Sequence, residues 1–145
     1  MVLVKRNTIS VYLHLVWATY ERHPIVTDAL EPEIIRCIHE ECQRQKCDVL
    51  AIGAMPDHIH LAVSFPATTT IAQLMKQVKG VSSAFARDAS KDGNFFGWQE
   101  GYGAFSFSPT HRERVVEYIR NQKQHHAENT IWPHAEKFGA DASDT

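Results

Sequence analysis

The order of strand-like and helix-like hydrophobic patterns constrains the fold of this 145-residue chain more than any other feature. Runs that favour strands, either β-branched and aromatic or strictly alternating, occupy residues 9–19, 48–54, 57–65 and 102–107. Helical spacing begins between Thr27 and Pro32 and ends near Lys46, and it recurs at 70–89 and 110–126. The order β-α-β-β-α-β-α predicts an α+β fold, a ferredoxin-like four-stranded antiparallel sheet with helices packed on one face. The opposite face of the sheet is then expected to be open.

Local signals indicate where some of these elements begin. Thr70 and Gln73 have the spacing of a capping box at the start of the second helix. Ser108 followed by Pro109 suits the N-cap and first turn of the last helix. The segment Met55-Pro-Asp57 is predicted to turn tightly between two strands, because proline pre-sets its own φ.

Two histidines, His58 and His60, flank a single isoleucine in the third predicted strand. Because successive strand side chains alternate, both imidazoles project from one face of the sheet, roughly 7 Å apart. That spacing suits two nitrogens holding one divalent metal ion, provided that a third ligand arrives from elsewhere. The alternative is a pair of ordinary, partly buried histidines with hydrogen-bond partners, and the spacing leaves both interpretations open. His14 is a possible neighbour on the same sheet face.

Composition and charge narrow the class of protein. A hydrophobic content of 43% fits one domain over residues 1–145, with about 129–145 as a partly flexible tail. No apolar run reaches the roughly 18 residues that a membrane span needs. The odd count of three cysteines indicates reduced thiols, so we expect a cytoplasmic protein. The net charge of −2 does not favour nucleic-acid binding, although basic residues between Lys76 and Lys123 could form a locally positive face.

The last predicted helix holds a second pair of candidate functional residues. Tyr118 and Gln122 are four residues apart and therefore lie on one side of that helix. Alone, they read as a tyrosine at the boundary of the core and a solvated glutamine. Beside a histidine pair, the phenol is a competent nucleophile toward a phosphodiester that a metal polarises. Two imidazoles and one amide oxygen would suit Mg²⁺ or Mn²⁺.

Three ordered motifs resemble those of a known family. They are Met-Pro-Asp-His58-Ile-His60-Leu, the segment from Trp98 to Ser106, and the segment from Tyr118 to His126. The opening strand is similar as well, so the resemblance covers roughly residues 9–128. The chain resembles the single-tyrosine HUH transposases of bacterial and archaeal insertion sequences, a family that includes the REP-associated tyrosine transposases.

The resemblance implies an enzyme that cleaves and rejoins single-stranded DNA at hairpin-marked element ends. His58 and His60 would be the HUH metal ligands, Gln122 the third ligand, and Mg²⁺ or Mn²⁺ the cofactor. Tyr118 would be the nucleophile and form a 5′-phosphotyrosine; rejoining reverses the step, so no nucleotide cofactor is implied. Family members are homodimers on an RRM-like core, and the tyrosine helix of one subunit can reach the histidine pair of the other.

The remaining residues receive lesser roles. Lys76, Lys79 and Arg87 on the second predicted helix are candidates for contacts with DNA phosphates. Asp57 is expected to shape its turn, and His126 matches the family pattern without a mechanistic role.

Two other functions stay open. A metal-dependent phosphodiesterase would use His58 and His60 to activate water, with Tyr118 merely structural. A non-catalytic RRM-like module would bind single-stranded nucleic acid through exposed aromatic side chains on the sheet and would tolerate His58→Ala. The histidine pair argues against the binding module, because such a module gains little from two imidazoles on one strand.

Overall fold

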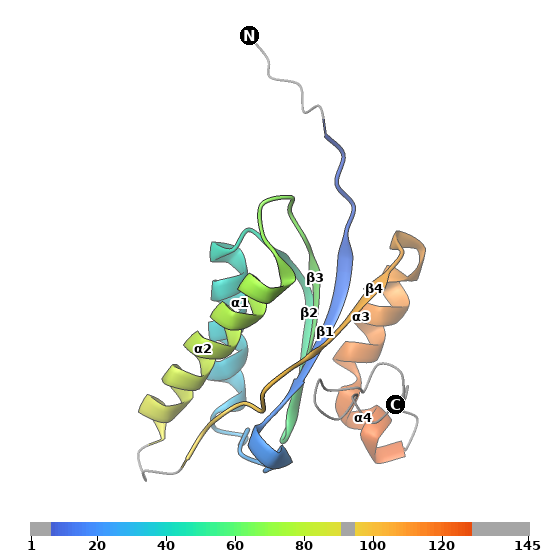
Figure 1. Cartoon of the computed structure of the whole chain (residues 1–145). Helices are drawn as coiled ribbons and strands as arrows, with labels where there is room; N and C mark the ends of the chain where they lie inside the picture. Colours follow the sequence, from blue (N-terminus) through green and yellow to red (C-terminus); the bar gives the residue numbers. More distant parts are fainter. Residues whose placement is uncertain (1–6, 91–94, 129–145) are drawn as a thin grey trace.

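The structure, a computed structural model, describes residues 7–90 and 95–128 and places a four-stranded sheet between two layers of helices (Figure 1). The sheet order is β2-β3-β1-β4, and every neighbouring pair of strands is antiparallel. This arrangement confirms the predicted α+β, ferredoxin-like fold. The predicted flexible tail lies outside the described residues. The strands are β1 (Tyr12–Ala18), β2 (Asp48–Met55), β3 (His58–Ser64) and β4 (Gly103–Phe107).

One face of the sheet is covered by α1 (Glu31–Arg44) and α2 (Ile71–Ala89), which lie side by side in Figure 1. Each of these helices has an apolar stripe at helical spacing, and alternate residues of the strands point toward it. Burial of these side chains removes apolar surface from water and holds the layers together. The fully buried members of this core include Leu15, Trp17, Ile34, Ile38, Ile59, Leu61, Leu74 and Val78.

Half of the predicted capping box at the start of α2 is present. Oγ1 of Thr70 accepts a hydrogen bond of 3.1 Å from the backbone N–H of Gln73. The side chain of Gln73 does not return the bond to Thr70 and instead donates to Oε1 of Gln45 at 3.1 Å. The cap therefore also ties the start of α2 to the end of α1.

The sheet face that was expected to be open is covered by α3 (Arg112–Arg120) and α4 (Gln122–Glu128) (Figure 1). The single helix predicted for 110–126 is thus two helices, because Asn121, with φ −103° and ψ 25°, leaves the helical region between them. Asparagine is a weak helix former whose side chain competes for backbone groups. The prediction that Ser108 caps this helix was wrong: Ser108 precedes a short 3₁₀ turn (Pro109–His111) ahead of α3, and its hydroxyl contacts the side chains of Thr110 and His111 in that turn.

Small residues on β2 and β3 let α3 approach the sheet closely. Ala51 and Ala62 are paired across the two strands and pack against Val115 of α3. At Gly53 a Cβ atom would collide with the backbone carbonyl oxygen of Ile119 and lie 3.2 Å from Cγ of Gln122. Glycine at this position therefore sets how near the junction between α3 and α4 can come to the strands.

All three cysteines are free thiols. Burial raises the pKa of Cys42 to about 12 and that of Cys47 to about 11, so both are neutral packing groups at ordinary pH. Within the described residues, no helix combines the length and the apolar character that crossing a membrane requires.

Candidate metal centre and nucleophile

The histidine pair of β3 faces the layer formed by α3 and α4. Ile59 and Leu61 enter the core beneath α1 and α2, so the alternating residues His58 and His60 lie on the opposite face. The prediction that both imidazoles share a face is confirmed. Their ring centroids are 5.0 Å apart, and their side chains are almost inaccessible, with 1% and 0% of their surface exposed.

A carboxylate orients the first of these histidines. Nδ1 of His58 donates to Oδ1 of Asp57 at 2.7 Å, and the guanidinium of Arg22 lies 3.1 Å from Oδ2 of the same carboxylate. Burial alone would raise the pKa of Asp57, but the hydrogen bond and charge of His58, followed by the charge of Arg22, outweigh it and lower the pKa. From the sequence, Asp57 was expected only to shape the turn. Its position directly before His58 was the available signal, since ligating histidines commonly donate to a carboxylate.

A third buried histidine orients the second. Nε2 of His14 lies 2.8 Å from Nδ1 of His60, and the two rings stack with centroids 5.0 Å apart. His14 sits opposite Ala62 in the register of β1 and β3, so it is a diagonal neighbour of His60. With Nδ1 of each β3 histidine held by a neighbour, Nε2 is the nitrogen that each ring can offer to a cation.

Tyr118 on α3 lies directly beside this pair. Its ring is edge-on to that of His60 with centroids 6.0 Å apart, and only 1% of its surface is exposed. Gln122 is equally buried and donates from Nε2 to the carbonyl oxygen of Tyr118 at 3.2 Å. The structure therefore brings all four predicted centre residues together within a single chain, while α3 and α4 shield them from solvent.

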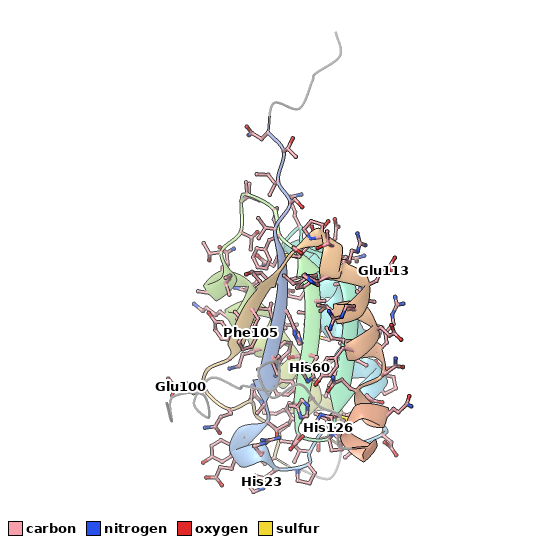
Figure 2. All side chains as sticks on the ribbon, turned by 90° about the vertical axis from the view of Figure 1, so that its right-hand side faces the viewer. His23, His60, Glu100, Phe105, Glu113 and His126 are labelled. Carbon is pink, nitrogen blue, oxygen red and sulfur yellow. The ribbon has the colours of Figure 1, made fainter. Side chains whose placement is uncertain are left out.

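His126 on α4 completes the cluster, although no role was expected for it from the sequence. Its ring centroid lies 4.9 Å from that of His58, and its Nε2 donates to Oε1 of Gln122 at 3.1 Å. Figure 2 looks onto this layer and shows His126 on α4 near His60 on β3. A partial signal was present in the i,i+4 spacing of Gln122 and His126, but whether the ring reaches the β3 histidines depends on where α4 lies after the break at Asn121.

The donor set of this cluster fits a divalent metal ion. Ligand atoms of His58, His60 and His126 all lie within 4.8 Å of one another, and an amide oxygen from Gln122 adjoins them. Imidazole nitrogens and a carbonyl oxygen together suit a mixed coordination sphere, and the carboxylate that holds Nδ1 of His58 is a usual partner of a metal-ligating histidine. The cluster could therefore hold a metal ion.

The three basic residues proposed for DNA contact are not part of this centre. Lys76, Lys79 and Arg87 belong to α2, which covers the opposite face of the sheet (Figure 1). The ammonium group of Lys79 donates to the carbonyl oxygens of Gln99 at 2.7 Å and Gly101 at 3.0 Å, and burial lowers its pKa. Lys79 thus ties the segment before β4 to α2, whereas Lys76 and Arg87 are exposed.

A ferredoxin-like sheet, a buried histidine cluster that could hold a metal ion and an adjacent tyrosine on a helix together place the chain among α+β proteins with a candidate metal centre. Comparison with known families then identifies the chain: the family described as "Transposase IS200 like" matches residues 7–122. The chain belongs to this family and is a transposase, an enzyme that cleaves and transfers DNA strands. It is 25% identical over 116 residues to the ISDra2 transposase TnpA of Deinococcus radiodurans, and the match covers 75% of this chain and 81% of that protein.

Solved structures share the fold. A protein of Deinococcus radiodurans R1 described as a transposase superposes with a TM-score of 0.66 at 23% identity, covering 84% of this chain and 98% of that one. A REP-associated tyrosine transposase bound to a REP hairpin superposes with a TM-score of 0.64 at 15% identity, covering 99% of this chain and 85% of that one. At these identities the likeness supports the architecture alone.

Proposed function

We propose that this transposase cleaves and rejoins single-stranded DNA at hairpin-marked element ends through a covalent 5′-phosphotyrosine. The observation that supports this most directly is the position of Tyr118, whose ring lies 6.0 Å from that of His60. It is the tyrosine of the described residues that adjoins the histidine cluster. A nucleophile and a metal-ligating group on neighbouring elements have their relative geometry fixed by the fold.

The proposed reaction exchanges one phosphodiester for another. The phenolic oxygen of Tyr118 attacks the phosphorus, the bond to the 3′ oxygen breaks, and the proton lost by the phenol ends on the departing 3′-hydroxyl. The downstream strand remains attached to Tyr118 through its 5′ phosphate. A divalent cation, Mg²⁺ or Mn²⁺, held by His58, His60 and Gln122 would neutralise and polarise the phosphate. Because a 3′-hydroxyl reverses the step with little change in bond energy, no nucleotide cofactor is needed.

Burial of the centre means that the helix layer must shift before DNA can react. Only 1% of Tyr118 and 2% of Gln122 are exposed, so a DNA strand reaches the phenol only after α3 moves relative to the sheet. The break at Asn121 between α3 and α4 offers a hinge for that movement.

The partners follow from the same proposal. One relative is known bound to a REP hairpin, which supports hairpin-bearing single-stranded DNA as the partner of this chain. With DNA as the substrate, we propose the cytoplasm as the site of the reaction. We also propose a homodimer, as the resemblance implies, although one chain brings its own Tyr118 to its own histidines. Lys76 and Arg87, which lie on the opposite face of the sheet, are proposed to contact phosphates of the DNA at a distance from the cleaved one.

The non-catalytic binding module has less support than the enzyme. Such a module needs exposed aromatic side chains on its strands. In residues 7–90 and 95–128, the large apolar side chains that are exposed all lie outside the four strands: Ile9, Val11, Tyr20 and Phe95.

The experiment that tests the proposal follows the fate of each end of a cleaved strand. The purified protein is incubated with Mn²⁺ and a pool of single-stranded oligonucleotides, each with a hairpin flanked by random sequence, and resolved on a denaturing gel. We expect a 3′ label to migrate with the protein and a 5′ label to be released on a shortened strand. The adduct should disappear in Tyr118→Phe and persist in Tyr20→Phe, the control at a partly exposed tyrosine.

Other outcomes would contradict the proposal. Strand cleavage that continues in Tyr118→Phe without an adduct would establish a metal-dependent phosphodiesterase that uses water. Hairpin binding that survives His58→Ala without any cleavage by the wild type would establish the binding module.

A further inference from the structure

We infer that His126 is a third imidazole ligand of the cation site, beside His58, His60 and Gln122. The inference rests on the proposed function, because it concerns the same centre. Ligand atoms of the three histidines lie within 4.8 Å of one another. Small side-chain rotations bring atoms at that separation onto one cation with bonds of about 2.1 Å.

The position of His126 relative to Gln122 matches that of two neighbouring ligands. Gln122 begins α4, so the two side chains lie one helical turn apart on the same side. Nε2 of His126 and Oε1 of Gln122 are 3.1 Å apart. Two ligand atoms at right angles on a cation with bonds of about 2.1 Å are separated by about 3.0 Å. The two atoms therefore already have the spacing that joint coordination requires, and coordination replaces their hydrogen bond once the imidazole proton shifts from Nε2 to Nδ1.

The imidazole of His126 also lies against the histidine pair of β3. The centroid of His126 is 4.9 Å from that of His58, with the planes tilted by 54°. His58 and His60 are themselves 5.0 Å apart by the same measure. The three imidazoles thus meet around one point at the junction of β3 and α4, and His126 is the most accessible of them.

A third imidazole changes which ions the centre prefers. Mg²⁺ takes oxygen ligands and retains its waters, whereas imidazole nitrogen is a better ligand for transition-metal ions. Three nitrogens and one amide oxygen therefore favour an ion such as Mn²⁺ over Mg²⁺. If His126 only oriented Gln122 through its hydrogen bond, the cation would have two nitrogens and this preference would be weaker.

The test counts imidazole nitrogens on a bound Mn²⁺ by pulsed electron paramagnetic resonance. The full chain is studied as wild type, His58→Ala, His126→Gln, His126→Ala, Gln122→Ala and His39→Gln, the last at an exposed histidine of α1. We expect three nitrogens in the wild type, two in His58→Ala and in both His126 variants, and three in Gln122→Ala and His39→Gln. Glutamine is a good helix former, so His126→Gln preserves α4 while removing the nitrogen.

Titration of the same proteins gives a second readout. The dissociation constant for Mn²⁺ should rise by about tenfold or more in His126→Gln, and that for Mg²⁺ should change less. This inference would be overturned, and the proposed function would stand, if the wild type had two coordinated nitrogens and this number fell in His58→Ala but not in His126→Gln. A Mn²⁺ spectrum without imidazole nitrogens, or a number of nitrogens that His58→Ala does not change, would overturn both this inference and the proposed function.

Discussion

At the residue scale, the centre depends on side chains that do not themselves reach the reacting atoms. Asp57 and His14 each hold Nδ1 of one β3 histidine, at 2.7 and 2.8 Å. These contacts select the nitrogen that is offered to a cation and fix the plane of each ring. Arg22 in turn holds Asp57 and keeps the carboxyl ionised.

Replacement of Asp57 by asparagine should weaken metal binding without unfolding the protein. The amide oxygen of the new side chain can still accept the hydrogen bond of His58, but the amide lacks the charge that makes the imidazole more basic. We expect Asp57→Asn to raise the dissociation constant for Mn²⁺ about 10- to 100-fold, as measured by calorimetric titration. Asp28→Asn, at an exposed position before α1, is the matched control and should leave it unchanged. Equal affinities for the two variants would show that Asp57 only shapes the turn.

Part of this centre could be predicted from the sequence. Alternation along a strand was enough to place His58 and His60 on one face, and the i,i+4 rule placed Tyr118 with Gln122. The bond between His14 and His60 could not be predicted, because it joins side chains 46 residues apart and depends on the register of β1 against β3. His126 was missed for a related reason: its role depends on where α4 lies after the break at Asn121.

At the scale of elements, the decisive contact is between α3 and the strands beneath it. Val115 and Ile119 pack against the small residues Ala51 and Ala62, and this contact carries Tyr118 to His60. Periodicity predicted α1 and α2, and it merged α3 and α4 into one helix because the apolar spacing continues across Asn121. It could not say which face of the sheet the last helix covers, because an apolar stripe fits either face. The small residues at alternate positions of β2 were the only local sign of a close helix.

Gly53→Ala should therefore separate α3 from the sheet. Its added Cβ would meet the carbonyl oxygen of Ile119, backbone that cannot yield easily. We expect a loss of about 1–3 kcal/mol in the free energy of unfolding, measured by urea denaturation, together with weaker Mn²⁺ binding. Gly80→Ala in α2 is the control: its Cβ meets nothing within 4 Å, and the change should stabilise the helix by up to about 1 kcal/mol. A Gly53→Ala variant as stable as the wild type would contradict the close approach.

At the scale of the whole molecule, the order of elements was enough to predict the fold. Four strands and three helices in the predicted order permit few sheet topologies. The observed order β2-β3-β1-β4 is the one that the ferredoxin-like arrangement requires. The net charge of −2 gave no indication of a DNA partner. DNA affinity in such a protein depends on where the basic side chains lie rather than on their total number.

Lys76 and Arg87, the exposed basic residues proposed to contact DNA, should contribute to its affinity through phosphate contacts that salt weakens. In a Tyr118→Phe background, the double change of Lys76 and Arg87 to alanine should lower the slope of log affinity against log salt by about 1 per residue. Fluorescence anisotropy with a hairpin oligonucleotide measures that slope. Arg36→Ala is the control, because this guanidinium is already paired with Glu33 and Glu40. An unchanged slope in the double variant would indicate that DNA does not contact α2 and lies on the other face of the sheet.

The most direct test of the central claim is to find the residue to which cleaved DNA becomes attached. Trypsin cleavage after Arg114 and Arg120 releases the peptide Val115–Arg120, in which Tyr118 is the only tyrosine. Mass spectrometry of the nuclease-trimmed adduct should show a nucleotide 5′-phosphate on Tyr118 in this peptide, formed only when a divalent cation is supplied. A nucleotide on Tyr12, Tyr20 or Tyr102, or on Tyr118 at equal yield in His58→Ala, would contradict the account.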